Sequence, residues 1–126
     1  MGKVNIQDIS LIPLKKINLK GGGVMHAIKH SELTFKGFGE AYFSQINFTE
    51  IKAWKLHLRM TMNLVVPVGE VQFVFIDSFG ETRIETIGEK NYSRLTVPPG
   101  LWFGFKGVSK KQSLILNIAN IEHSPE

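Results

Sequence analysis

The stretch IKAWKLHLRMTMNLVVPVGEVQFVFID, residues 51 to 77, decides the fold class. Its two apolar runs are rich in Val, Ile and Phe and meet at Gly69. Glycine supplies the backbone conformation of a tight bend, so PVGEV (67–71) predicts two strands joined as a tight hairpin. The same stretch opens on basic and titratable side chains, which are unusual in a strand aimed at a core: Lys52, Lys55, His57 and Arg59.

Glycine and proline interrupt the whole sequence, and runs of about five to eight apolar and β-branched residues lie between them. We expect strands near residues 24–29, 40–47, 51–59, 63–67, 70–77, 82–87, 92–97, 101–106 and 112–120. The prolines of VPPGLW (97–102) indicate a strand entry or edge, because proline cannot donate to a ladder. No segment keeps an apolar period of 3.6 residues. The pattern predicts an all-β sandwich or barrel with little or no helix.

Length and composition indicate a small globular protein. The chain has 126 residues, 43% hydrophobic and 21% charged, which suits a single domain over residues 1–126. It has no apolar run of about 18 residues and no secretory signal at its start. Cysteine is absent, which excludes disulfides and thiolate chemistry. We expect a cytoplasmic protein without a membrane partner.

The formal net charge of +4 is a mild excess that suits a small anionic ligand. No run of five or more basic residues occurs, so we expect no nucleic-acid partner. Glycine-rich GGGV (21–24) precedes no predicted helix and is not a phosphate-binding loop. No serine stands in a nucleophile elbow, so acyl-transfer chemistry has no support.

Side chains of a regular strand alternate between two faces, and this rule divides residues 51–59. One face would carry Ala53, Lys55, His57 and Arg59, and the other Lys52, Trp54, Leu56 and Leu58. The first face either meets water or lines a barrel that is open at one end, and a barrel of about eight strands can hold one small ligand. For the core we expect Trp54, Leu56, Phe73, Phe75 and Phe105.

His57 is the candidate general base, because an imidazole titrates near neutral pH. The cations Lys55 and Arg59 on its face would favour the neutral ring and would attract an anionic substrate. A solvated strand face is the alternative interpretation of these residue types. A metal site would need converging His or carboxylate ligands, and none is near His57 in sequence. We therefore predict neither a metal nor a cofactor.

Three stretches together resemble the dTDP-4-dehydrorhamnose 3,5-epimerase family of cupins and the related dTDP-sugar 3,4-ketoisomerases. They are residues 40–77, ETIGEKNYSRLTVPPGLWFGFKG (85–107) and LNIANIEHSPE (116–126). VPPGLWFGF is similar to the entry strand P-x-G-x-x-H-G-F of the family. The resemblance implies a cupin-type double-stranded β-helix, which is a jelly-roll barrel. It also implies a homodimer in which an N-terminal strand pairs with the sheet of the partner.

The resemblance also implies roles for individual residues. WKLH (54–57) stands where the epimerases carry a basic-Gly-Leu-His strand, so His57 falls on the catalytic base. FSQIN (43–47) is similar to the F-x-Q-x-N pattern that binds the nucleotide sugar, which implies substrate binding by Gln45 and Asn47. Tyr42 is similar to an active-site tyrosine of the ketoisomerases. Asn63 replaces a lysine of the family's substrate site, and Lys55 and Arg59 would hold charge.

The sequence departs from the family in two catalytic groups. The epimerases carry a catalytic tyrosine on the strand after H-G-F, and QSLILNIANIEH (112–123) contains none. The aspartate that orients the histidine in the family has no counterpart here. The resemblance implies an epimerase or ketoisomerase of a dTDP-4-keto-6-deoxy sugar in surface-polysaccharide synthesis. The alternative is a non-catalytic sugar-nucleotide-binding cupin that has lost the tyrosine.

Overall fold

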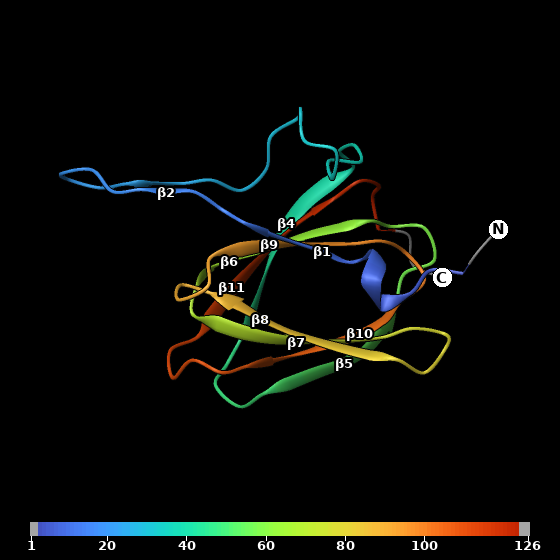
Figure 1. Cartoon of the computed structure of the whole chain (residues 1–126). Coiled ribbons are helices and arrows are strands. Elements are labelled where there is room, and N and C mark those ends of the chain that lie inside the picture. The colour runs from blue at the N-terminus through green and yellow to red at the C-terminus, as the bar shows by residue number, and fades with distance from the viewer. Residues whose placement is uncertain (1–2, 124–126) are drawn as a thin grey trace.

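The computed structural model describes residues 3–123 of the chain as an all-β protein (Figure 1). One 3₁₀ helix precedes the strands, at Ile6–Asp8. The strands are β1 (Ser10–Pro13), β2 (Lys16–Ile17), β3 (Val24–Met25), β4 (Glu40–Ile46), β5 (Ile51–Leu56), β6 (Met62–Val68), β7 (Glu70–Ile76), β8 (Thr82–Gly88), β9 (Ser93–Val97), β10 (Trp102–Gly107) and β11 (Ser113–Ala119). In the described part of the chain, no helix is long and apolar enough to cross a membrane.

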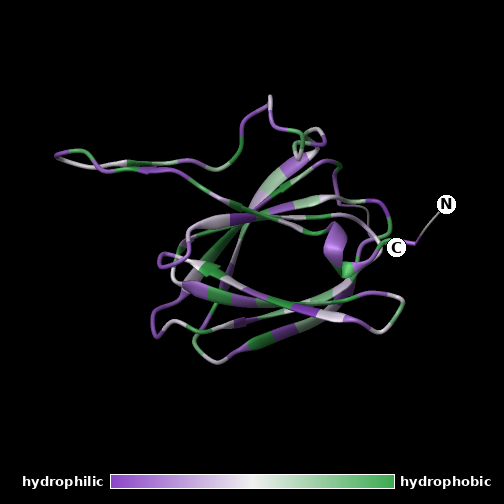
Figure 2. Cartoon of the chain, viewed as in Figure 1, coloured by the Kyte–Doolittle hydropathy of each residue, from purple (hydrophilic) through white to green (hydrophobic). Residues whose placement is uncertain are grey.

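Two sheets face each other and form a jelly-roll barrel. The larger has the order β1-β9-β6-β11-β4 and the smaller the order β5-β10-β7-β8, and the pairs within both are antiparallel. Strand β7 shows why the sheets pack, because Val71, Phe73 and Phe75 are buried while the residues between them are partly exposed. This alternation appears along the strands in Figure 2. The expected core positions Phe73 and Phe75 are confirmed.

The strands expected from residue 40 onward are confirmed to within a few residues, and so is the all-β class. The prediction of a tight hairpin at Gly69 is wrong in one respect. The bend is present, with Gly69 at φ 87°. However, β6 pairs with β9 and β11, whereas β7 pairs with β8 and β10, so the bend carries the chain from one sheet to the other. Strand β1 was not among the expected strands, and it lies at the edge of its sheet, where Pro13 is tolerated.

A two-stranded arm, residues 14–25, projects from the barrel and carries β2 and β3 (Figure 1). The end of the arm that joins the barrel is held by side chains at the start of β9. The hydroxyl of Tyr92 donates to the carbonyl oxygen of His26 at 2.8 Å. The guanidinium of Arg94, which is 0% exposed, donates to the carbonyl oxygen of Ala27 and to the side chains of Glu32, Thr34 and Asn63. Residues 26–34 therefore lie against the outer face of the larger sheet.

Strand β5 contains a bulge that reverses its faces. Phe103 pairs with Lys55 and Phe105 with Lys52, so two residues of β5 oppose the single residue Gly104 of β10. A bulge of this kind shifts the alternation by one residue. Lys52 and Lys55, three positions apart, consequently face the same side. The bulge fits closely against β10, because a Cβ atom added at Gly104 would lie 2.7 Å from the Cβ of Ala53.

We predict that Gly104→Ala lowers the free energy of unfolding by about 1–3 kcal/mol, the usual cost of forcing an extra methyl group into a packed site. Ala53→Gly in the same chain should recover a large part of this loss, because it removes the atom that the new methyl group would meet. Urea denaturation of the two single variants and the double variant measures the coupling. Additive effects would contradict the close fit, since Ala53→Gly alone should cost only about 0.5–1 kcal/mol.

Candidate active site

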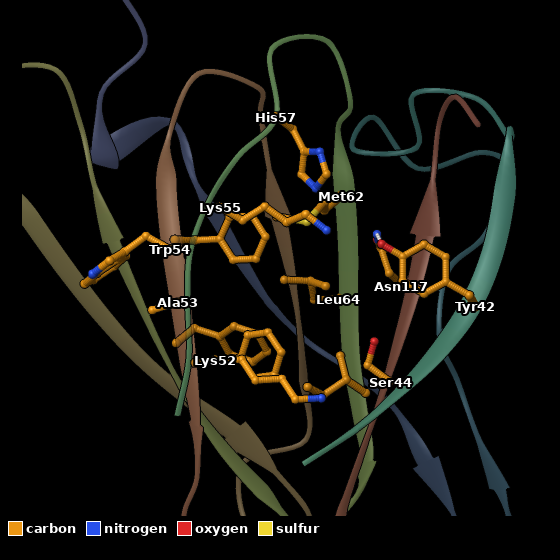
Figure 3. A pocket seen from close by; sticks show the side chains of 14 residues that line it. Tyr42, Ser44, Lys52, Ala53, Trp54, Lys55, His57, Met62, Leu64 and Asn117 are labelled. Carbon is orange, nitrogen blue, oxygen red and sulfur yellow. Dashed lines mark hydrogen bonds between the residues drawn. The ribbon is translucent and has the colours of Figure 1, made fainter. Parts of the chain in front are cut away.

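A pocket of about 350 Å³ opens between the free edges of the two sheets (Figure 3). One wall comes from β5, β7 and β10 of the smaller sheet, and the other from β4, β6 and β11 of the larger sheet. Its lining residues are Tyr42, Ser44, Lys52, Ala53, Trp54, Lys55, His57, Met62, Leu64, Phe73, Phe103, Phe105, Ile115 and Asn117. The pocket is thus mostly apolar with a few polar groups, as sites for small ligands usually are.

The β5 wall carries two lysines because of the bulge. Lys55 lines the pocket as the alternation predicted, and Lys52 lines it as well. The amine of Lys52 donates to the carbonyl oxygen of Gln45 at 3.0 Å and so links the two sheets. The predicted core position of Trp54 is wrong, and so is the placement of Lys52 on the face opposite Lys55. Trp54 is 52% exposed, and Leu56 is only partly buried.

His57 follows the end of β5 and is only partly exposed. Its ring stacks on Phe103 with 5.7 Å between the ring centroids, and the ring of His123 meets it edge-on at 6.3 Å. Its carbonyl oxygen accepts a hydrogen bond from the amide of Gly100 at 2.8 Å. Burial lowers the pKa of His57 below the ordinary 6.5, and the charges of Lys55 and His123 lower it further. The ring is therefore neutral, and able to accept a proton, at neutral pH.

A second pocket of about 640 Å³ shares Trp54, Lys55 and His57 with the first. It is also lined by Arg59 and Trp102. His57 thus lies at the boundary of an inner, largely apolar pocket and an outer pocket with cations and indole rings. An elongated ligand with an anionic group could occupy both.

The opposite wall presents Tyr42 from β4 and Asn117 from β11, which are paired in register (Figure 3). The Asn117 amide nitrogen donates to the Tyr42 hydroxyl oxygen at 3.0 Å. Tyr42 and His57 line the same inner pocket from different sheets. A group held between them could be approached by the imidazole from one side and by the phenol from the other.

Three of the expected substrate-binding residues do not line either pocket. Gln45 and Asn47 are exposed and share Gln112 as a hydrogen-bond partner, because Tyr42 and Ser44 are the residues of β4 that face inward. Asn63 is buried beneath the segment 26–34. Its amide oxygen accepts hydrogen bonds from Arg94 and from Thr96. Asn63 therefore serves the packing of that segment, not the pocket.

Three polar residues of the pocket were missed by the sequence analysis: Ser44, Lys52 and Asn117. Lys52 was assigned to the wrong face because nothing in residues 51–56 signals a bulge. Asn117 stands between Ile115 and Ala119 on the inward face of β11, where Ser113 is the other polar residue, and a polar residue between two apolar ones was the available signal. Within residues 3–123 no group of three or more His, Asp or Glu residues is arranged to hold a metal ion.

A jelly-roll barrel that carries a partly buried histidine and basic side chains around a pocket at its open end has the architecture of a cupin. No family model matches the sequence. The chain is 34% identical to the solved dTDP sugar isomerase of Desulfovibrio desulfuricans G20, with a TM-score of 0.90 over 94% of this chain and 80% of that one. The dTDP-4-dehydrorhamnose 3,5-epimerase of Sulfolobus tokodaii shares the fold at 21% identity, with a TM-score of 0.83 over 98% of this chain and 77% of that one.

Among curated proteins, the spore coat polysaccharide biosynthesis protein SpsL of Bacillus subtilis is 24% identical, over 96% of this chain and 84% of that protein. The family assignment rests on the identity to the Desulfovibrio isomerase and on the share of both chains that the match covers. The chain belongs to the cupin family of dTDP-sugar isomerases and epimerases.

We predict that His57 titrates below pH 6.5 and that Lys55→Gln raises its pKa, because removing a neighbouring cation favours the protonated ring. The imidazole proton resonances of the four histidines, followed by NMR across pH 5–8, measure both values, and His57→Gln assigns the signal. Lys110→Gln, in an exposed turn, is the control. An unchanged His57 pKa in Lys55→Gln would show that the amine does not act on the ring.

Proposed function

We propose that the chain is an epimerase or ketoisomerase of a dTDP-4-keto-6-deoxy sugar in surface-polysaccharide synthesis, with His57 as the general base. The relatives support the coarser part of this statement, an epimerase or isomerase of dTDP sugars. The observation that carries the finer part is the meeting of His57 and Tyr42 in one pocket, from opposite sheets. The proposal needs no metal ion, because a neutral imidazole can itself remove a proton next to a carbonyl group.

In the proposed reaction the free ring nitrogen of His57 takes the proton from the carbon beside the keto group. The electron pair of the broken C–H bond forms the enolate, whose charge collects on the former keto oxygen. Cationic donors near that oxygen stabilise the charge. The amine of Lys55 lines the same pocket as His57, and Arg59 lines the outer pocket. We therefore assign Lys55 to the enolate or the adjoining phosphate, and Arg59 to the diphosphate.

Tyr42 is the proposed acid. A phenol carries an O–H group whose proton it can give to an enolate. Delivery to carbon from the wall opposite His57 would invert the centre, and delivery to oxygen would produce the enediol of a ketoisomerisation. In a ketoisomerisation the enediol then takes a proton on the former keto carbon and loses one from the oxygen of the neighbouring carbon, so that the carbonyl group moves. The imidazolium of His57 loses its proton to solvent and the phenolate of Tyr42 takes one up, which restores the starting state. This role compensates for the absence of a tyrosine on β11.

One observation favours the second candidate, a non-catalytic sugar-nucleotide-binding protein. Residues 113–119 contain no tyrosine, so the late-strand tyrosine of the epimerases has no counterpart there, and Tyr42 is the one tyrosine that lines either of the two pockets described above. A protein that binds the nucleotide sugar without reaction would keep the cations and the apolar wall. Proton exchange distinguishes the two functions.

We predict that the protein incorporates solvent deuterium into dTDP-4-keto-6-deoxyglucose beside its keto group, and that His57→Gln slows this exchange by roughly 10²–10⁴-fold. Proton NMR of the sugar in D₂O measures the rate at each position. His30→Ala, which changes an exposed histidine outside both pockets, is the matched control. Exchange that survives His57→Gln would refute the assigned base, and binding without exchange would favour the second function.

Proton NMR of the sugar in D₂O with the Tyr42→Phe variant separates the role of the acid from the role of the base. Loss of the phenol should leave deuterium exchange beside the keto group largely intact while slowing formation of the isomerised product. Tyr92→Phe is the control, since Tyr92 bonds the carbonyl oxygen of His26 and lines neither pocket. Unchanged product formation in Tyr42→Phe would remove Tyr42 from the reaction.

We also propose that the chain forms a homodimer. The arm at residues 14–25 exposes Leu19, Val24 and Met25, and an isolated two-stranded ribbon is marginally stable in water. The outer face of the larger sheet, next to edge strand β4, exposes Phe43 at 63% beside the partly exposed Leu116. A second copy would cover both surfaces, as closed symmetric pairing requires.

Light scattering at micromolar concentration should give twice the chain mass of 14.2 kDa. Phe43→Lys should shift the equilibrium toward monomer, because the charge would enter an apolar contact. The matched control is Phe79→Lys, since Phe79 is 62% exposed on the turn between β7 and β8, away from the arm. A monomer mass for the unmodified protein would contradict the dimer.

A further inference from the structure

The packing of the barrel does not explain the amide oxygen of the Asn117 side chain. Asn117 is 2% exposed and lies in the wall of the inner pocket. Its amide nitrogen donates to the hydroxyl of Tyr42 at 3.0 Å and approaches the sulfur of Met60 at 3.8 Å. Its amide oxygen has no hydrogen-bond partner among the described residues, and it is the one buried side-chain polar atom there in that condition.

Asn63 shows what a structural asparagine looks like in this protein. It is 3% exposed, and its amide oxygen accepts from Arg94 at 3.1 Å and from Thr96 at 2.6 Å. Its nitrogen donates to the carbonyl oxygen of Thr34 at 3.3 Å. Both ends of that amide are satisfied by the chain. Buried polar atoms are nearly always satisfied in native proteins, so an unsatisfied one calls for a partner from outside the chain.

The strand itself gives no reason for an amide at position 117. The inward-facing neighbours on β11 are the buried Ile115 and Ala119, and the facing residue of β6 is Leu64. An apolar residue would fit this pattern and would leave no acceptor without a partner. The amide is therefore explained by the contents of the pocket.

The chemistry of the atom identifies the ligand group. A carboxamide oxygen only accepts hydrogen bonds, so its partner must carry a hydrogen. Phosphate oxygens and a keto oxygen do not, whereas a sugar hydroxyl and the N3–H of thymine do, and the hydroxyl is the one that would lie in the inner pocket with the sugar. We infer that the amide oxygen of Asn117 accepts a hydrogen bond from the hydroxyl group on carbon 2 or carbon 3 of the sugar, and so selects sugars that carry it. This inference rests on the proposed function for the identity of the ligand.

The other end of the same amide positions Tyr42. Because the amide nitrogen donates to the phenol oxygen, one lone pair of that oxygen is occupied, and the phenol hydrogen is free to point at the ligand. The two ends of Asn117 thus fix the sugar and the proposed acid relative to each other. Asn117 is a binding residue for the sugar and a positioning residue for Tyr42.

Calorimetric titration tests the inference with four ligands: dTDP, dTDP-4-keto-6-deoxyglucose, and the 2-deoxy and 3-deoxy analogues of that sugar. The unmodified protein should bind one of the two deoxy analogues roughly 10- to 100-fold more weakly than the full sugar, the usual range for a lost hydrogen bond to a buried group. Asn117→Leu should bind the three sugars within about threefold of one another. All forms should bind dTDP alike.

Two further variants complete the design. Asn117→Asp keeps an acceptor oxygen and should retain the preference for the hydroxylated sugar. Gln112→Leu removes an exposed amide outside both pockets and should bind as the unmodified protein does. Thermal denaturation checks folding, and Asn117→Leu should unfold at or above the temperature of the unmodified protein, because it removes an unsatisfied buried acceptor.

Because binding is measured instead of turnover, the inference and the proposed function can fail separately. Equal binding of all three sugars by the unmodified protein overturns the inference, whatever the variants do, and deuterium exchange could still support the enzyme. A preference that persists in Asn117→Leu also overturns it. Discrimination through Asn117 without any exchange would support the inference and refute the catalytic function. No binding of any sugar would refute both.

Discussion

The fit of the β5 bulge against Gly104 is the constraint on which the candidate site depends. A regular strand would put Lys52 and Lys55 on opposite faces. The extra residue puts both amines on the inner wall, next to the neutral ring of His57. The absence of a side chain at Gly104 permits the close approach of Ala53 that the bulge needs. A local backbone irregularity thereby concentrates positive charge at the end of the barrel that is open to ligand.

The two-sheet architecture divides the remaining tasks. The smaller sheet supplies the two amines of β5, an aromatic wall of Phe73, Phe103 and Phe105, and the imidazole of His57 just after β5. Strands β4 and β11 supply a phenol and an amide. Water is a poor competitor in a pocket lined mainly by aromatic and aliphatic groups, and electrostatic interactions are stronger there than in bulk solvent. The polar groups of the pocket therefore interact with a bound ligand more strongly than they would in water.

The strands were predictable because their apolar alternation is strong, and Phe73 and Phe75 were assigned to the core for that reason. The site was predictable only in part. His57, Lys55 and Tyr42 were found through residue type and family resemblance. Lys52 was not, because a bulge leaves no mark in hydropathy. Gln45 matched a motif but faces outward on β4, because a motif does not tell which face of the strand a residue is on. Asn63 matched a substrate position but accepts a hydrogen bond from Arg94, because a motif does not show that residues 26–34 cover this face of the sheet.

The burial of Arg94 has a consequence for the order of assembly. The guanidinium holds residues 26–34 only where β6 and β9 are already side by side, since its partners include Asn63 of β6 and the carbonyl oxygen of Ala27. Tyr92, just before β9, fixes the other side of the arm's base. An unfolded or half-folded chain cannot present the arm in a defined direction. The direction of the arm is thereby coupled to the pairing of β6 with β9 in the barrel.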